Sequence, residues 1–161
     1  MEFVYASAGR RLLGFVIDFF LLGTVSSLLL PLFDVTLEDI AEGTLPRAWE
    51  WTYIALTGLY QVGFVAWRGQ TPGKMAVRTK VVSEAGGQVP GIGTAGARWL
   101  LVGAATALPV IGVLVLAAVY GSLMFDSRRQ GIHDKVARTV VVDLFLPTAA
   151  PAGENGASGD L

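Results

Sequence analysis

The stretch "GRRLLGFVIDFFLLG", residues 9–23, places Asp18 among large apolar side chains. It belongs to a hydrophobic run, residues 12–33, that holds one charge in 22 positions. A helix needs about 20 apolar residues to cross the hydrocarbon core of a bilayer. The run is therefore long enough to span a membrane. A carboxylate near the middle of such a span costs about 2.5–3.5 kcal/mol on insertion scales, so Asp18 requires an explanation.

Two further runs have the same character. Residues 48–67 hold one charge in 20 positions, and residues 99–125 hold none in 27. Charged residues make up 16% of the 161-residue chain, against about a quarter in soluble domains. A soluble helical bundle would have too little polar sequence to cover three such helices. We therefore expect an all-α membrane protein with about three hydrophobic helical segments, the first retained as an anchor and not removed as a signal peptide.

The loops between the runs differ in charge. Residues 34–47 carry four acids and one arginine, whereas residues 68–98 carry five basic residues and one acid. Short basic loops stay on the cytoplasmic side. We expect the N-terminus and residues 68–98 to be cytoplasmic, with the protein in the plasma membrane.

The third run, residues 99–125, does not fit a simple pattern of crossings. One crossing would put the basic residues 126–143 outside, whereas two full crossings need about 40 residues. Pro109 lies in the middle and would kink a helix. The run is therefore either one kinked span or two half-length, re-entrant helices, and charge slightly favours the second.

The segments between and after these runs predict a small cytoplasmic sheet. "VRTKVVSEAGGQV", residues 77–89, is typical of a β-hairpin that turns at Gly86-Gly87. "RTVVVDLF", residues 138–145, is strand-like and is expected to pair with residues 76–83. We see no internal repeat. Residues 1–146 form the predicted transmembrane domain, and residues 147–161, rich in Pro, Ala and Gly, a disordered tail.

The buried charges are the candidate functional residues. Arg11 and Asp18 are seven apart and share a helix face, about 10 Å from each other. They are too distant to touch, so we expect both to bind one shared polar partner from another element, with Asp134 as the candidate through a shared proton, ion or water. Secondary candidates are Gln61, His133 and Arg129.

Several functional classes are disfavoured. The chain has no cysteine and one histidine, so we expect no metal site and no cofactor. The sequence shows no nucleophile–base pair, so we expect that the chain is not an enzyme. Its net charge of −1 argues against nucleic acid as a partner.

Three motifs in this order resemble the RDD family of membrane proteins, named for one arginine and two aspartates. They are "RRLLGFVID", "GQTPGKMAVRTKVV" and "RRQGIHDKVARTVVV", and the resemblance covers roughly residues 7–143. It implies that Arg11, Asp18 and Asp134 are the three named residues. A transport role, including cation/proton exchange, is suggested for the family, which is otherwise poorly characterised.

Two functions remain open. In the first, an oligomeric transporter moves cations, protons or a small solute, with Arg11, Asp18 and Asp134 as its ion site. In the second, these residues form a structural polar clasp in a membrane scaffold or accessory subunit. Both require the lipid bilayer, and either a second copy of the chain or a membrane partner protein.

Overall fold

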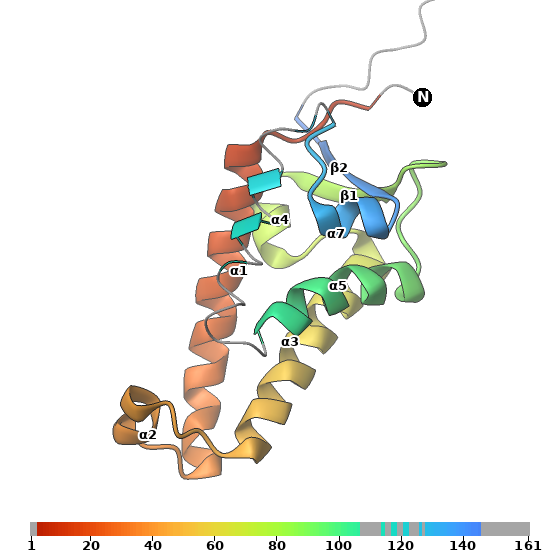
Figure 1. Cartoon of the computed structure of the whole chain (residues 1–161). Coiled ribbons are helices and arrows are strands. Elements are labelled where there is room, and N and C mark those ends of the chain that lie inside the picture. The colour runs from red at the N-terminus through yellow and green to blue at the C-terminus, as the bar shows by residue number, and fades with distance from the viewer. Residues whose placement is uncertain are drawn as a thin grey trace, which may run out of the picture.

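The computed structural model describes residues 3–106, 114, 117–118, 121–122, 126 and 128–145. Two long helices dominate it, α1 (Ala8–Leu29) and α3 (Arg47–Arg68). The third long element, α5 (Ile92–Thr106), lies across them (Figure 1). The short elements that follow α3 gather around the N-terminal end of α1, which we call the sheet end. They are α4 (Pro72–Ala76), β1 (Thr79–Ser83), α7 (Ile132–Val136) and β2 (Thr139–Asp143).

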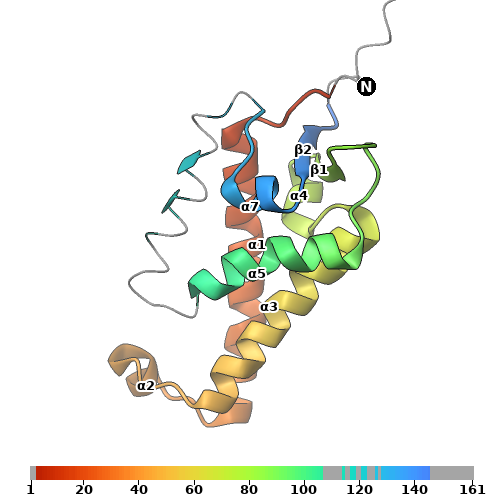
Figure 2. The ribbon, with the colours of Figure 1, turned by 45° about the vertical axis from the view of Figure 1, so that its right-hand side comes forward.

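The long helices begin and end at residues suited to those positions. Ser7 caps α1 by accepting a hydrogen bond from the backbone N–H of Arg10 at 3.3 Å. A 3-10 turn, η1 (Leu30–Phe33), follows α1, and the short helix α2 (Leu37–Glu42) lies at the end of the molecule opposite the sheet (Figure 2). α3 ends at Gly69, whose φ of 73° suits glycine.

One described helical segment, Ala8–Phe33, is apolar and long enough to cross a membrane, with a mean hydropathy of 2.1. α3 also has 22 residues, about 33 Å of helix. Its Trp, Tyr, Gly and Gln residues make it less apolar than α1. α5 begins before the predicted third run and reaches Thr106. Pro109, with the choice between one kinked span and two half-helices, lies outside the described residues.

The small sheet confirms the predicted pairing but not the predicted hairpin. β1 and β2 are antiparallel, with Val81 opposite Val141. Residues 4–6 extend the sheet, because Ala6 donates its N–H to the carbonyl of Val141 at 2.9 Å. Residues 84–91 form a turn and a loop with no strand, so the hairpin prediction is wrong. The backbone that would return along β1 makes two bonds with Ser83, one from Ser83 N–H to the Gln88 carbonyl and one from Gly87 N–H to the Ser83 carbonyl, and then leaves β1.

The sheet contributes to a buried apolar cluster. Its inner side meets the end of α3 and the start of α5, through a buried cluster of small residues: Ala6, Val65, Val81, Ala95 and Val141. Large apolar side chains elsewhere on α1 are exposed, as expected for a helix that faces lipid; Phe20 is 67% and Leu28 74% exposed.

The structure reveals an internal repeat, which corrects the expectation of none. Residues 68–83 (the first repeat) and 128–143 (the second repeat) each form a short helix followed by a strand. Six of their 16 positions are identical: Arg68/Arg128, Gln70/Gln130, Arg78/Arg138, Thr79/Thr139, Val81/Val141 and Val82/Val142. The central pair of the sheet joins equivalent residues, so a local two-fold axis passes between Val81 and Val141.

The two repeats share their internal hydrogen bonds. Gln70 Nε2 donates to the carbonyl of Thr79 at 2.9 Å, and Gln130 Nε2 to that of Thr139 at 3.0 Å. Arg78 and Arg138 both take the left-handed backbone conformation, with φ of 51° and 49°. The sequence identity between the two repeats covers few residues, and both repeats mix polar and apolar side chains. A search for hydrophobic periodicity therefore does not detect them.

Candidate functional site: two buried carboxylate clusters

One stripe along α1 is buried, and it carries both charges of the first predicted motif. Arg11, Gly14, Asp18, Leu22 and Ser26 follow one another at helical spacing and face the rest of the molecule. α4 crosses α1 at Gly14. A Cβ on Gly73 would overlap the carbonyl oxygen of Gly14 and lie 2.7 Å from the Asp18 carboxyl. The two glycines therefore let the backbones approach closely enough for Asp18 to reach α4.

Asp134 is the centre of one cluster, at the N-terminal end of α1. It is fully buried, and its two carboxylate oxygens accept from Arg98 of α5 and Arg11 of α1. The backbone N–H of Gly131 adds a third bond, at 3.0 Å. Charge-assisted bonds of this kind offset the cost of burying the ions. We call Arg11, Arg98, His133, Asp134 and Thr139 the Asp134 cluster.

Electrostatics within the Asp134 cluster favour charged arginines beside a charged carboxylate. Burial alone would raise the pKa of Asp134, but the charges of Arg98 and Arg11 hold it well below its usual value. Burial, followed by the charge of Arg98, lowers the pKa of His133 from 6.5 to about 3. His133 is thus neutral, and its Nε2 lies 3.2 Å from Arg98 Nη2 as an acceptor.

Asp18 is the centre of a second cluster, nearly two helical turns beyond Arg11 along α1. Its carboxylate accepts from Tyr60 Oη of α3 at 2.6 Å, from Thr71 Oγ1 at 2.5 Å and from the N–H of Gly73 at 2.7 Å. Lys74 Nζ lies 3.9 Å from it. We call these five residues the Asp18 cluster. It answers why an aspartate interrupts an apolar run: Asp18 joins α1 to α3 and α4.

Lys74 carries the charge that balances Asp18. Its side chain is 18% exposed, and its ammonium lies 3.4 Å from Thr71 Oγ1. Burial, followed by the charge of Arg98, lowers the pKa of Lys74 from 10.5 to about 8. Lys74 is therefore a charged group at neutral pH that titrates closer to neutrality than an ordinary lysine.

The structure brings the predicted residues together differently from the expectation. Arg11 does meet Asp134, and Asp18 does meet a polar partner from another element, the backbone N–H of Gly73 in α4. Asp18, however, bonds neither to Arg11 nor to Asp134, so a partner common to Arg11 and Asp18 is wrong. Of the secondary candidates, His133 belongs to the Asp134 cluster, and Arg129 contributes its carbonyl to Arg11 while its side chain is exposed.

Sequence reasoning missed two charged residues of the clusters. The charge pattern of the sequence indicates only basic loop residues at Arg98 and Lys74. Arg98 could have been found, because it directly precedes an uncharged run and would enter the protein with it. Lys74 gives no comparable signal, since its burial depends on the close crossing of Gly14 and Gly73.

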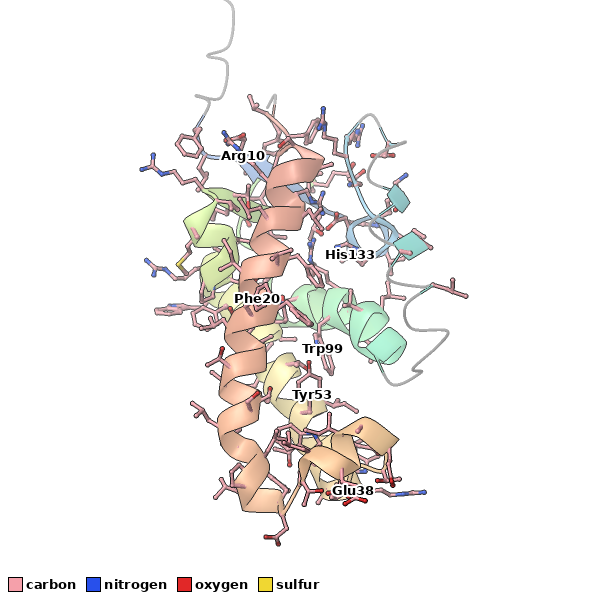
Figure 3. The ribbon with its side chains drawn as sticks, turned by 90° about the vertical axis from the view of Figure 1, so that its left-hand side faces the viewer. Arg10, Phe20, Glu38, Tyr53, Trp99 and His133 are labelled. Carbon is pink, nitrogen blue, oxygen red and sulfur yellow. The ribbon has the colours of Figure 1, made fainter. Side chains whose placement is uncertain are left out.

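A cavity of about 190 Å³ lies between the clusters and the three long helices. Its polar end is formed by Asp18, Lys74, Arg98 and His133, and Gln61 lines it from α3. Figure 3 shows His133, Trp99 and Tyr53 one after another beside α1, from the sheet end towards α2. Within the described residues no group of three or more His, Cys, Asp and Glu side chains could hold a metal ion.

An apolar helix of membrane-spanning length with exposed large apolar side chains is a feature of helical membrane proteins. At its N-terminal end α4, α7, β1 and β2 enclose the buried charges, and we call these four elements the polar cap. The sequence model of the RDD family matches residues 5–138, which is most of the chain. The chain belongs to the RDD family. Comparison with curated proteins and with solved structures finds no significant match.

Proposed function

We propose that this chain is a non-catalytic membrane scaffold or accessory subunit in which Arg11, Asp18 and Asp134 act as a structural polar clasp. The observation that carries the proposal is the saturation of both carboxylates by donors of this chain. Asp134 accepts from two arginines and a backbone N–H, and Asp18 from two hydroxyls and a backbone N–H. Groups satisfied in this way hold elements together.

The clasp joins the two short helices of the polar cap, α4 and α7, to the long helices. Through Asp134, α7 is attached to α1 and α5; through Asp18, α4 is attached to α1 and α3. β1 and β2 follow these short helices directly, so the sheet is fixed as well. We propose that the cap lies in the cytoplasm and presents a fixed surface to a membrane partner or to a second copy of the chain.

Cation exchange at the two carboxylates receives less support from this geometry. A bound Na⁺ or K⁺ needs several oxygen ligands. At Asp134 it would have to displace two guanidinium groups, and at Asp18 it would meet an N–H and an ammonium. Transport of a small solute is the second candidate, because the cavity lies next to both clusters.

The test compares Asp18→Asn with Asp34→Asn in the full chain. An asparagine at residue 18 would turn an N–H₂ group towards the donors of Thr71 and Gly73, so we expect a loss of about 3 kcal/mol of stability. Asp34 is exposed and left-handed (φ 54°), a conformation that asparagine tolerates, so its variant should unfold like the wild type.

Thermal unfolding in a nonionic detergent measures the stability of each variant. Cation-driven proton flux in proteoliposomes measures transport. The proposal predicts a lower melting temperature for Asp18→Asn and no flux with sodium, potassium or lithium. Flux that disappears in Asp18→Asn while the melting temperature is unchanged would establish transport instead.

A further inference from the structure

The cavity beside the clusters combines a charged end with apolar walls. Lys74 and Arg98 lie at the charged end together with Asp18, which is 2% exposed. The walls are aromatic and aliphatic side chains from all three long helices, among them Phe15, Phe19, Val65 and Trp99. A site of this composition suits a ligand with one polar group and an apolar body.

The charges around the polar end do not cancel. Arg11, Arg98 and Lys74 contribute three positive charges, and Asp18 and Asp134 two negative charges. His133 is neutral, because burial and Arg98 lower its pKa to about 3. The five charged groups therefore sum to +1, in surroundings where an unbalanced charge is costly. A ligand with a single negative charge would balance them.

Lys74 is the cation best placed to meet such a ligand. An ammonium group has three donors. Its contacts with Thr71 Oγ1 at 3.4 Å and Asp18 Oδ2 at 3.9 Å are both longer than an ordinary charge-assisted hydrogen bond of about 2.7–2.9 Å. Arg98, by contrast, is committed to Asp134 and Thr139.

The cavity volume limits the apolar part of the ligand. An engineered apolar cavity of about 150 Å³ holds one benzene molecule. The present cavity, at about 190 Å³, therefore has room for one aromatic ring with a small charged substituent, or for a short length of alkyl chain. Trp99 lies against Gly58 of α3 and Gly103 of α5, at about 3 Å from the position of a Cβ on either, so its ring forms a fixed wall.

We propose that this cavity binds an organic monoanion, a carboxylate attached to an apolar group of about benzene size, with the carboxylate at Lys74 and the apolar group beside Trp99. Such a ligand has two sources, a soluble aromatic acid or a fatty acid from the bilayer. The proposal does not depend on the scaffold function.

Binding of the carboxylate at Lys74 should depend on pH. The charged and titratable groups around Lys74 are Asp18 and Arg11 from α1, Arg98 from α5, and His133 and Asp134 from α7. Tyr60 from α3 bonds to Asp18. Burial and the neighbouring Arg98 lower the pKa of Lys74 to about 8. Binding should therefore be strong near pH 7 and should weaken as the pH rises above 8 and the ammonium loses its proton.

The probes are benzoate and laurate for the two sources, with benzyl alcohol and dodecanol as uncharged counterparts. Binding is measured on the full chain in a nonionic detergent by isothermal titration calorimetry and by the shift in melting temperature. We expect a carboxylate to bind about tenfold or more tightly than its alcohol at pH 7, and this preference to shrink at pH 9.5.

Three variants locate the site. Lys74→Met should weaken carboxylate binding about tenfold or more, whereas Lys135→Met, which changes an exposed lysine, should not. Val102→Phe fills the cavity without changing any charge and should abolish binding, which keeps the test valid if Lys74→Met does not fold.

The outcomes separate the two sources and can overturn the proposal. Binding of benzoate identifies a soluble acid as a ligand; binding of laurate alone identifies the bilayer as the source. Binding of neither carboxylate, equal binding of carboxylate and alcohol, or equal binding to wild type and Val102→Phe would each overturn it.

Discussion

The first and second repeats share a backbone but carry opposite charges at the third residue of their short helices. Lys74 stands in α4 where Asp134 stands in α7. Each pairs with the opposite charge on a long helix that crosses it: Lys74 with Asp18 of α1, and Asp134 with Arg98 of α5 as well as Arg11. The shared glutamine and threonine specify the helix–strand unit, whereas the charged position matches each unit to its own long helix.

The pairs also differ in strength. Asp134 has two guanidinium groups in direct contact, whereas Lys74 lies 3.9 Å from Asp18, which is held mainly by neutral donors. The second repeat is therefore fixed by ion pairs and the first by close backbone contact.

The close contact in the first repeat is most sensitive at Gly73. A methyl group there would overlap the Gly14 carbonyl, which belongs to helix backbone and cannot give way. We expect Gly73→Ala to abolish the yield of folded, monodisperse protein after size-exclusion chromatography. Gly63→Ala on α3 is the control. It should purify normally, because a Cβ at this position would have no neighbour within 4 Å. A normal yield for Gly73→Ala would show that α1 and α4 are held in another way.

The ion pairs of the second repeat predict a large effect at Asp134. Asp134→Asn leaves two buried arginines without a carboxylate, at an expected loss of about 3–5 kcal/mol. Thermal unfolding in detergent measures it. The double variant Asp134→Asn with Arg98→Met should lose less than the sum of the two single variants, because the residues interact directly. Simple additivity would argue against the pair.

Acid should weaken the second repeat through His133. The folded protein keeps His133 neutral down to a pKa of about 3, whereas an unfolded chain protonates it near 6.5. Its contribution is complete above pH 6.5 and is lost as the pH falls, by about 2 kcal/mol between pH 6.5 and 4.5. Asp134 adds its own loss only at lower pH, because its pKa lies below 3.8. Melting temperatures measured across this range check the slope; His133→Gln should flatten it, and an unchanged slope would contradict the assignment.

The smallest effect is expected at the exposed arginine shared by both repeats. Arg138 has a φ of 49°, so glycine fits its backbone, and its side chain is exposed. We expect Arg138→Gly to change the stability by less than about 1 kcal/mol. Urea titration of the detergent-solubilised protein measures the change. A large loss would mean that this side chain, and not the backbone, is what the two repeats share.

The sequence predicts some features because they depend on local pattern. The apolar runs predict α1 and α3, alternation predicts β1 and β2, and a carboxylate in an apolar run marks Asp18 as a buried group with a polar partner. The choice of partner depends on where helices cross. Asp18 meets Gly73 and Lys74 because two glycines, one on each helix, let the backbones touch, and no spacing within α1 encodes that contact.

The measurement that tests the clasp most directly is hydrogen–deuterium exchange in Asp134→Asn. The account predicts that amides of β1 and β2, such as those of Val81 and Val141, exchange about tenfold faster or more, because the cap is released from α1 and α5. Amides in the half of α3 near α2 should be unaffected. Unchanged exchange in the sheet would contradict the claim that these charges hold the cap to the helices.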